Sequence, residues 1–253
     1  MNNIDFKIEN DIGFLTFDLK GSKANKLSFE VLEELDSHLD EIEQNSTLKV
    51  LVLQSAKESI FVAGADIKQI EAFVDEEVAY EAIIKGDNIF NKLENLKVPT
   101  IAYINGACMG GGLELALCCN YRVATTNAKT KLSFPEVKLG FFPGLGGTQR
   151  APKVVGLINA LDIILTGKNL DAKKAYRIKL VDEVFHDGQK EFKLKSFIQR
   201  VVENKISKKR KFNLNTILEK FSLTRSIIYK KTLQTLEKKV NRDFKGPYKA
   251  LEV

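Results

Sequence analysis

Two glutamates, each close to a run of glycines, are the residues of this sequence best suited to chemistry. Gly110-Gly111-Gly112 lies between two apolar segments, Val98–Ile104, which predicts a buried strand, and Leu113–Cys119, which predicts a helix. Glycines at such a junction let a substrate approach the main chain with no Cβ in the way. The first N–H groups of a helix have no partner within it and favour negative charge. The glycine run is therefore a candidate oxyanion site.

Glu114 is the single acid of the otherwise apolar helix that follows. One interpretation is structural, because an acid in the first turn of a helix is stabilised by the helix dipole. The other is that its carboxylate stands beside the oxyanion site and takes part in a reaction there. The glycines alone do not decide between them.

A second acid, Glu136, follows a short apolar segment, 132–134, that predicts a strand. The glycine-rich run Gly144-Leu145-Gly146-Gly147 comes soon after it and leads into a predicted helix near 154–165. This run lacks the Gly-Lys-Ser/Thr ending of a phosphate loop and the glycine spacing of a dinucleotide-binding fold. Nucleotide binding is therefore only weakly indicated.

Composition excludes several other classes of protein. The 253 residues are 44% hydrophobic, with three cysteines, two histidines and no apolar run near twenty residues. This composition predicts a globular protein with no membrane span, no metal site and no histidine-dependent triad. The first residues lack the pattern of a secretory signal, so we expect a reducing, cytoplasmic location.

Strands alternate with helices through residue 188, which predicts an α/β fold with crossover connections. The predicted strands are Ile12–Leu19, Lys49–Gln54, Ile60–Ala63, Val98–Ile104, Tyr121–Ala124 and 132–134. The predicted helices before residue 130 are one that Ser28 caps, Ile67–Phe73, Glu77–Leu96 and Leu113–Cys119. After Gly188 the pattern is helical only, with amphipathic segments Phe192–Val202 and Thr216–Val240. We therefore divide the chain into a core, 1–188, and a helical extension, 189–253.

The extension is strongly basic. It holds 18 Lys and Arg against 6 Asp and Glu, a charge of +12, whereas residues 1–188 hold 21 against 27, a charge of −6. Such a segment could meet nucleic acid, a membrane surface or an acidic partner, or its charges could simply lie in solvent.

Four motifs in order resemble the crotonase (enoyl-CoA hydratase/isomerase) superfamily over roughly residues 4–188. They are Phe61–Lys68 (FVAGADIK), Ile104–Ala116 (INGACMGGGLELA), Pro135–Gly140 (PEVKLG) and Pro143–Arg150 (PGLGGTQR). The resemblance implies the crotonase-like spiral of ββα units. Asn215–Val253 resembles the segment that follows the hydratase domain in multifunctional fatty-acid-oxidation α-subunits, so we expect a dehydrogenase domain beyond the helical extension and a thiolase partner in a longer protein.

The resemblance also implies a role for each matched position. The backbone N–H groups of Ala65 and Gly111 would form the oxyanion hole for a CoA thioester, and Glu114 and Glu136 would hold the water that adds to its double bond. Further substrate contacts are implied at Ala63, Gly64, Asp66, Ile67, Lys68, Gly110, Pro135, Phe141, Pro143, Gly144 and Asn25.

The implied reaction is hydration of trans-2-enoyl-CoA to 3-hydroxyacyl-CoA in fatty acid β-oxidation, which needs neither metal nor redox cofactor. Two departures from the family's pattern stand out. Phe141-Phe142 places bulk where the acyl pocket is expected, which predicts an effect on chain length. Lys179 stands where the family usually has a glycine before Leu-Val, which predicts a slightly altered turn.

Two alternatives remain. An isomerase that moves a double bond from position 3 to position 2 usually relies on one carboxylate, so the presence of both glutamates favours hydration. A non-catalytic crotonase homologue that binds RNA or protein would use the basic extension. Its aromatic residues, however, have core-like spacing rather than a stacking pattern: Phe192, Phe197, Phe212 and Phe221. As to assembly, a trimer, as in free-standing crotonases, and a monomer are both compatible with the sequence.

Overall fold

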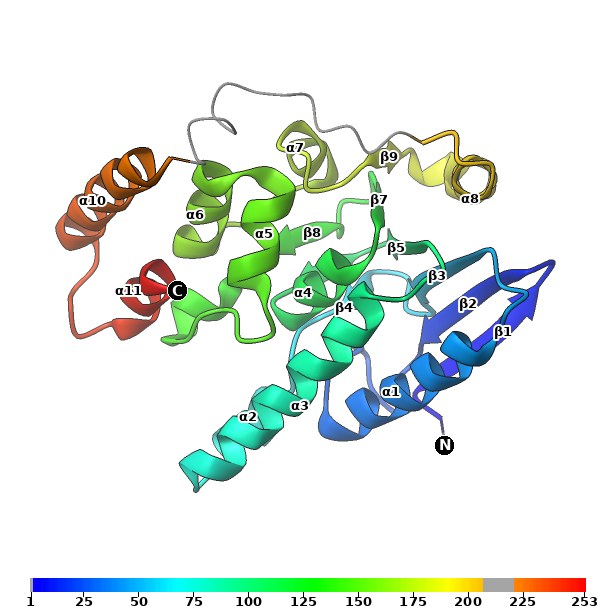
Figure 1. Ribbon diagram of the computed structural model, residues 1–253, viewed down its shortest axis with the longest axis horizontal. Coiled ribbons are helices and arrows are strands. Elements are labelled where there is room, and N and C mark those ends of the chain that lie inside the picture. The colour runs from blue at the N-terminus through cyan, green and yellow to red at the C-terminus, as the bar shows by residue number, and fades with distance from the viewer. Residues whose placement is uncertain (1, 207–220) are drawn as a thin grey trace.

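A computed structural model describes residues 2–206 and 221–253 (Figure 1). Its strands are β1 (Ile4–Glu9), β2 (Ile12–Phe17), β3 (Val50–Ser55), β4 (Ile60–Val62), β5 (Thr100–Ile104), β6 (Ala107–Met109), β7 (Tyr121–Thr125), β8 (Lys131–Ser133) and β9 (Glu183–Phe185). Its helices are α1 (Phe29–Gln44), α2 (Ile67–Glu71), α3 (Glu76–Glu94), α4 (Gly111–Cys118), α5 (Gly147–Val155), α6 (Leu157–Thr166), α7 (Ala172–Arg177), α8 (Lys190–Val202), α10 (Ser222–Lys239) and α11 (Lys245–Glu252), with short 3-10 helices η1 (Pro135–Leu139) and η2 (Asp187–Gln189).

The strands form two sheets that the chain visits in turn. The larger has the order β1-β2-β3-β5-β7-β9, parallel except for the β1–β2 hairpin, and the smaller is the parallel set β4-β6-β8. The pairs β3/β4, β5/β6 and β7/β8 each give one strand to each sheet before the chain enters a helix. Three such ββα turns make a spiral, and the predicted fold is confirmed.

One prediction about the glycine run was wrong. The strand that enters it is β6, in the smaller sheet, and not the segment Val98–Ile104, which supplies β5. Between the two strands, Gly106 passes so close to the chain that an added Cβ would lie 2.0 Å from the carbonyl carbon of Ser59. The sequence of β6, Ala-Cys-Met, has no β-branched or aromatic residue and lies between glycines, so it carries no strand signal.

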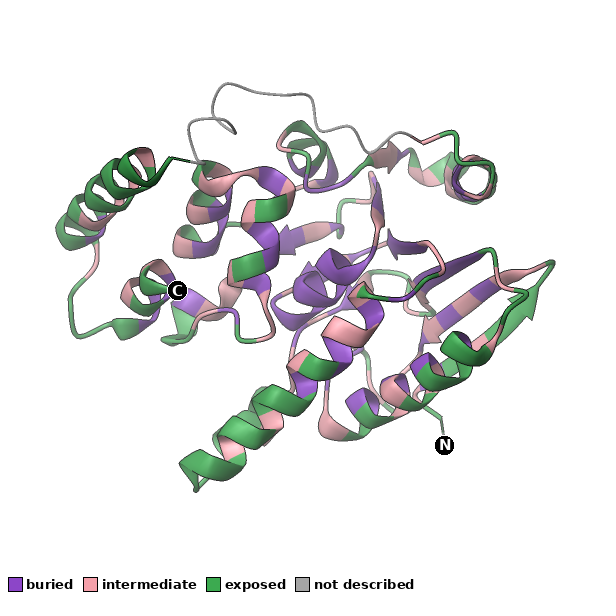
Figure 2. Ribbon diagram, viewed as in Figure 1, coloured by how far each residue is buried: buried purple, intermediate pink, exposed green. Residues whose placement is uncertain are grey.

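The central strands separate two cores. Leu51 and Leu53 of β3 point into the larger core, while Val50 and Val52 point to the opposite side, where α8 covers them with Phe197 and its neighbours. This is the alternation expected of a strand that is buried on both faces. In Figure 2, α4 at the centre is buried throughout, whereas much of α3 and α10 is exposed.

Two of the described helices of residues 189–253, α8 and α11, pack directly on the spiral, and α10 packs on α11. Besides α8, the last helix, α11, contacts η1 and α6, and its Ala250 is buried in the larger core. Of the predicted helix Thr216–Val240, the structure describes α10, while the basic run 208–211 and Phe212 lie outside the described residues. The division at residue 188 stays a prediction.

Lys179 has a left-handed conformation with φ of +67°. Glycine adopts this conformation without cost and lysine rarely does; the altered turn stays a prediction. The Lys179 ammonium lies 4.9 Å from the centre of the Tyr176 ring, a favourable cation–π contact.

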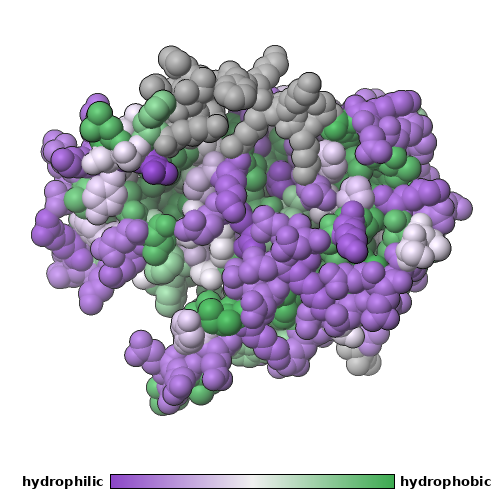
Figure 3. Space-filling model, viewed as in Figure 1, coloured by the Kyte–Doolittle hydropathy of each residue, from purple (hydrophilic) through white to green (hydrophobic). Residues whose placement is uncertain are grey.

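The surface in Figure 3 is mainly hydrophilic, with apolar side chains scattered over it. Within the described residues, none of the helices combines the length and the apolar character that crossing a membrane requires.

Candidate active site

Glu114 is held inside the protein by two main-chain groups. It lies in the first turn of the wholly buried α4, and its own exposure is 2%. The N–H groups of Leu145 and Gly147 both donate to its Oε1 atom, at 2.8 Å each. Burial raises the pKa of Glu114 to about 7, although the two N–H donors and the charge of Arg150 act in the opposite direction.

Glu136 lies on η1 and is held more loosely. Its Oε2 atom is buried and has no hydrogen-bond partner among the described residues. Burial and, second, repulsion from Glu114 raise the pKa of Glu136 to about 8. An unpartnered buried carboxyl oxygen is costly, and such strain in a native structure is typical of a functional site.

Glycines make room for both carboxylates. Gly110, with φ of +51°, faces Glu136, whose Oε1 would lie 2.7 Å from an added Cβ. Gly147 faces Glu114 in the same way, with Oε1 and Cγ 2.9 Å from an added Cβ. The two runs of glycine therefore have a second purpose, which is to let the two acids pack against main chain.

The predicted oxyanion donors lie side by side. A Cβ on Gly111 would be 3.5 Å from the nitrogen of Ala65, and one on Gly64 would be 3.9 Å from the nitrogen of Gly111. The loop before Ala65 is fixed, since Leu27 donates to the Gly64 carbonyl at 2.9 Å and accepts from the Asp66 N–H at 3.0 Å. Among the described residues, no hydrogen bond uses the N–H of Ala65 or of Gly111. Two adjacent free donors fit an oxyanion hole, which stays a prediction.

The remaining predicted substrate contacts differ in their structural surroundings. Asp66 caps α2 by accepting from the Lys68 N–H at 3.2 Å, and the side chains of Ile67 and Lys68 are exposed. Near the second acid, Pro135 begins η1. The contact predicted for Ala63 stays a prediction.

The loop after η1 holds the other predicted contacts. Phe141 is 47% exposed, Pro143 is buried, and an added Cβ on Gly144 would meet nothing within 4 Å.

Asn25 requires a correction. Its side chain has no exposed surface, so it offers no contact to a substrate in this structure. Its amide donates to the carbonyls of Phe17 and Phe61 and to the Ser55 hydroxyl, and it accepts from the Leu19 N–H. Asn25 therefore ties the loop to the sheets, because a buried amide is stable only when its donors and acceptor are paired.

Sequence reasoning missed three residues of the site. The N–H groups of Leu145 and Gly147 fix Glu114. The Arg150 guanidinium donates to the carbonyl of Leu145, and the Arg150 side chain is 5% exposed. A backbone donor has no residue-type signature, so the only available signal was the Gly-Leu-Gly-Gly run itself.

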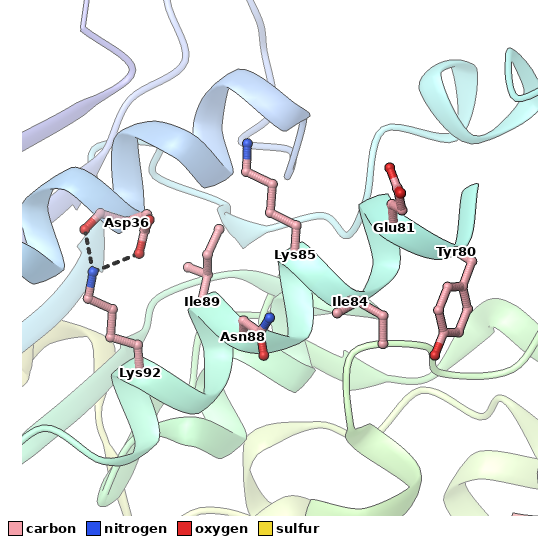
Figure 4. A pocket seen from close by; sticks show the side chains of 8 residues that line it. All are labelled: Asp36, Tyr80, Glu81, Ile84, Lys85, Asn88, Ile89 and Lys92. Atoms are coloured by element: carbon pink, nitrogen blue, oxygen red, sulfur yellow. Dashed lines mark hydrogen bonds and ion pairs between the residues drawn. The ribbon is translucent and has the colours of Figure 1, made fainter. Parts of the chain in front are cut away.

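A shallow pocket between α1 and α3 lies apart from these groups (Figure 4). It is lined by charged and apolar side chains, and its Lys92 is paired with Asp36 and Asp40 at 2.8 and 2.6 Å. None of the predicted site residues lines it.

A spiral of ββα turns that encloses one buried and one partly buried carboxylate defines a protein of the crotonase class. The model of the family "Enoyl-CoA hydratase/isomerase" matches residues 7–251, and the chain belongs to this family. The match runs well past residue 188 and through the described helices of the extension.

Relatives agree with this assignment. The chain is 40% identical over 248 residues to the fatty acid oxidation complex subunit alpha of Shewanella loihica, covering 97% of this chain and 35% of the relative. The chain thus spans about a third of the length of the curated relatives it matches.

Solved structures give the same assignment. An enoyl-CoA hydratase from Bacillus anthracis has 28% identity and a TM-score of 0.74, with 98% of this chain and 90% of that one covered. An enoyl-CoA hydratase from Thermoplasma volcanium has 27% identity and a TM-score of 0.70, with 94% and 98% covered.

Proposed function

We propose that this chain hydrates trans-2-enoyl-CoA to 3-hydroxyacyl-CoA in fatty acid β-oxidation. The single observation that carries the proposal is the pair of glutamates: Glu114 is buried and fixed by two N–H donors, and Glu136 is partly buried with one buried oxygen that has no partner among the described residues. Family membership and the relatives named for fatty acid oxidation support the substrate class.

The two acids divide the work by protonation state. Burial raises the pKa of both acids; repulsion from Glu114 raises that of Glu136 further, whereas two N–H donors and Arg150 lower that of Glu114, so Glu114 is the first of the two to ionise. Glu114 is then the base and Glu136 the acid, since a pair of groups whose environments separate their pKa values divides acid and base roles. With Oε1 held by two N–H donors, Oε2 of Glu114 is the atom left to accept a proton.

The reaction balances with these groups alone. Glu114 takes a proton from water as the water oxygen bonds to the β carbon, and the electrons of the double bond move toward the thioester oxygen. The free N–H groups of Ala65 and Gly111 stabilise the negative charge that develops there. Glu136 gives its proton to the α carbon, and transfer of the proton from Glu114 to Glu136 then restores both acids. No electrons enter or leave, so the proposed step calls for no redox cofactor.

The place of this chain in a longer, multifunctional enzyme is proposed from the relatives alone. A chain that matches about a third of a fatty acid oxidation complex subunit would supply the hydratase step of a longer enzyme. A dehydrogenase domain would then receive the 3-hydroxyacyl product, and a thiolase partner would act after it.

The test uses trans-2-enoyl-CoA of short and long chain and follows loss of the conjugated-thioester absorbance. The double variant Glu114→Gln/Glu136→Gln serves as the blank, and 3-enoyl-CoA tests for isomerisation. Faster loss with the wild-type chain supports hydration, whereas conversion of 3-enoyl-CoA alone would favour the isomerase. Tight RNA binding that survives in the double variant, without turnover of either substrate, would favour the non-catalytic alternative.

A further inference from the structure

Leu145 connects Glu114 to a second buried charge. Its N–H donates to Oε1 of Glu114 at 2.8 Å, and its carbonyl accepts from Nη1 of Arg150 at 2.7 Å. The same residue therefore contacts the carboxylate on one side and the guanidinium on the other.

The guanidinium is itself fixed by one face of α3. Its Nε donates to Oε2 of Glu94 at 2.7 Å, and its Nη2 donates to Oδ1 of Asn91 at 2.6 Å. Asp87, one turn before Asn91, lies 3.7 Å from Nη1 and accepts from the Asn91 amide at 2.9 Å. Residues spaced by four and three along a helix share a face, so α3 presents three acceptors to one arginine.

The loop is built to admit this side chain. An added Cβ on Gly146 would lie 2.0 Å from Nη1 of Arg150, and the φ of Gly146 is +81°. Any other residue at position 146 would displace the arginine or strain the backbone. The glycine between the two N–H donors is thus required by Arg150, not by the carboxylate.

We propose that Arg150 is a positioning residue for Glu114. It holds the Leu145 carbonyl so that the N–H groups of Leu145 and Gly147 converge on one carboxylate oxygen, and its charge favours the ionised carboxylate. Planar guanidinium suits this task because it donates in several fixed directions at once, which an ammonium does not. The proposal deepens the proposed function and rests on it for the role of Glu114 as base.

Other titratable and charged groups lie near Glu114 and Arg150. The carboxylates of Asp87 and Glu94 on α3 pair with the positive charge of Arg150, and Cys118 on α4 and Glu136 on η1 interact electrostatically with Glu114. Because burial raises the pKa of the Cys118 thiol well above its usual value, it stays neutral over the tested range.

The test measures kcat/KM against pH for Arg150→Met, which removes the charge, and Arg150→Lys, which keeps it without the fork. We expect kcat for Arg150→Met to fall about 10- to 100-fold with KM changed by less than about 3-fold, because misplacing one catalytic group has effects of this size. The acid limb, which reports ionisation of Glu114 in the free enzyme, should move up by about one pH unit. The kcat and the acid limb of Arg150→Lys should lie between those of the wild type and those of Arg150→Met.

Arg122→Met is the matched control. Arg122 is also 5% exposed, and it donates to the carbonyls of Leu180, Cys119 and Ala116. Its loss should lower the melting temperature without moving the acid limb. The proposal is overturned if Arg150→Met loses stability like the control but keeps the wild-type kcat and an unshifted acid limb of the pH profile. If Arg150→Met does not fold, an Arg150→Lys variant with the wild-type kcat and an unshifted acid limb overturns it instead.

A second readout separates this proposal from the proposed function. The infrared band of the protonated Glu114 carboxyl, assigned by its loss in Glu114→Gln, gives the titration without turnover. A higher titration midpoint of Glu114 in Arg150→Met supports the positioning role, even if the protein does not hydrate enoyl-CoA. An unchanged midpoint overturns the positioning role, even if the protein does hydrate enoyl-CoA.

Discussion

Glu114 is buried and Glu136 is partly buried, and the protein holds the two carboxyl groups in opposite ways. Glu114 lies on an α-helix of the core and has one oxygen saturated by two N–H donors. Glu136 lies on a short 3-10 helix at the edge of the spiral and keeps an oxygen without a partner among the described residues. The comparison teaches that one carboxylate is fixed by donors that partly offset the cost of burying its charge, while the other is left able to hold and release a proton.

The largest expected effect comes from removing either carboxyl group. Glu114→Gln and Glu136→Gln should each lower turnover of enoyl-CoA by about 10²–10⁴-fold, the range of general acid–base catalysis. Glutamine keeps an oxygen that accepts from Leu145 and Gly147, so the first variant should keep its fold. Steady-state kinetics together with circular dichroism check both points.

The double variant provides the sharper comparison. If the two carboxyls act as a unit, the double variant should lose little more than each single variant. Losses of only a few-fold in both single variants would contradict the assignment of acid and base.

Replacing the facing glycines tests the placement of each acid without changing its chemistry. Gly110→Ala would put a Cβ 2.7 Å from Oε1 of Glu136, and Gly147→Ala would put one 2.9 Å from Oε1 of Glu114. Each should lower kcat about 10- to 100-fold, since displacement by about 1 Å is enough for such losses. Gly110→Ala should also destabilise the fold, because its φ of +51° is unfavourable for alanine.

Gly188→Ala, in η2 and outside the predicted site residues, is the control. An added Cβ there meets nothing within 4 Å, so kcat should stay near that of the wild type. Equal losses in all three variants would mean that the loops tolerate no change, and the comparison between the two acids would lose its support.

Stability against pH tests how each acid is held. A carboxyl whose pKa is higher in the folded than in the unfolded chain binds more protons when folded, so the free energy of unfolding falls as pH rises through that window. For Glu136 the window runs from its ordinary value of 4.5 to about 8. Glu136→Gln should therefore be more stable than the wild type by about 1–3 kcal/mol at pH 9, with most of the gain lost at pH 5.

Glu114→Gln should gain less, because the N–H donors of Leu145 and Gly147 limit the upward shift of its pKa to about 7. Urea unfolding at the two pH values measures both variants against the wild type. A larger gain for Glu114→Gln would reverse the comparison between the fixed and the free carboxylate.

The sequence could predict the two acids and the spiral because four motifs in order carry them. It could not predict the contacts that distinguish Glu114 from Glu136, since these are backbone N–H groups and a side chain, Arg150, that reaches from another helix. β6 went unrecognised because its sequence, Ala-Cys-Met, has no β-branched or aromatic residue and lies between Gly106 and Gly110. Asn25 was misplaced because a polar residue in a loop looks the same in sequence whether it is buried or faces a substrate.

The smallest expected effect concerns Phe141, which follows η1 and its Glu136. The N–H of Phe141 donates to the Glu136 carbonyl at 3.0 Å, and 47% of the residue is exposed, so its ring can yield space without disturbing the core. Phe141→Ala should raise the ratio of kcat/KM for long-chain over short-chain enoyl-CoA by about 2- to 10-fold, the scale of a few methylenes of apolar contact. Competition between the two substrates in one assay measures the ratio directly. Because Phe141→Ala leaves the hydrogen bonds of Glu114 in place, its acid limb should not move, and a shifted limb would show that the two sides of the site are not held independently.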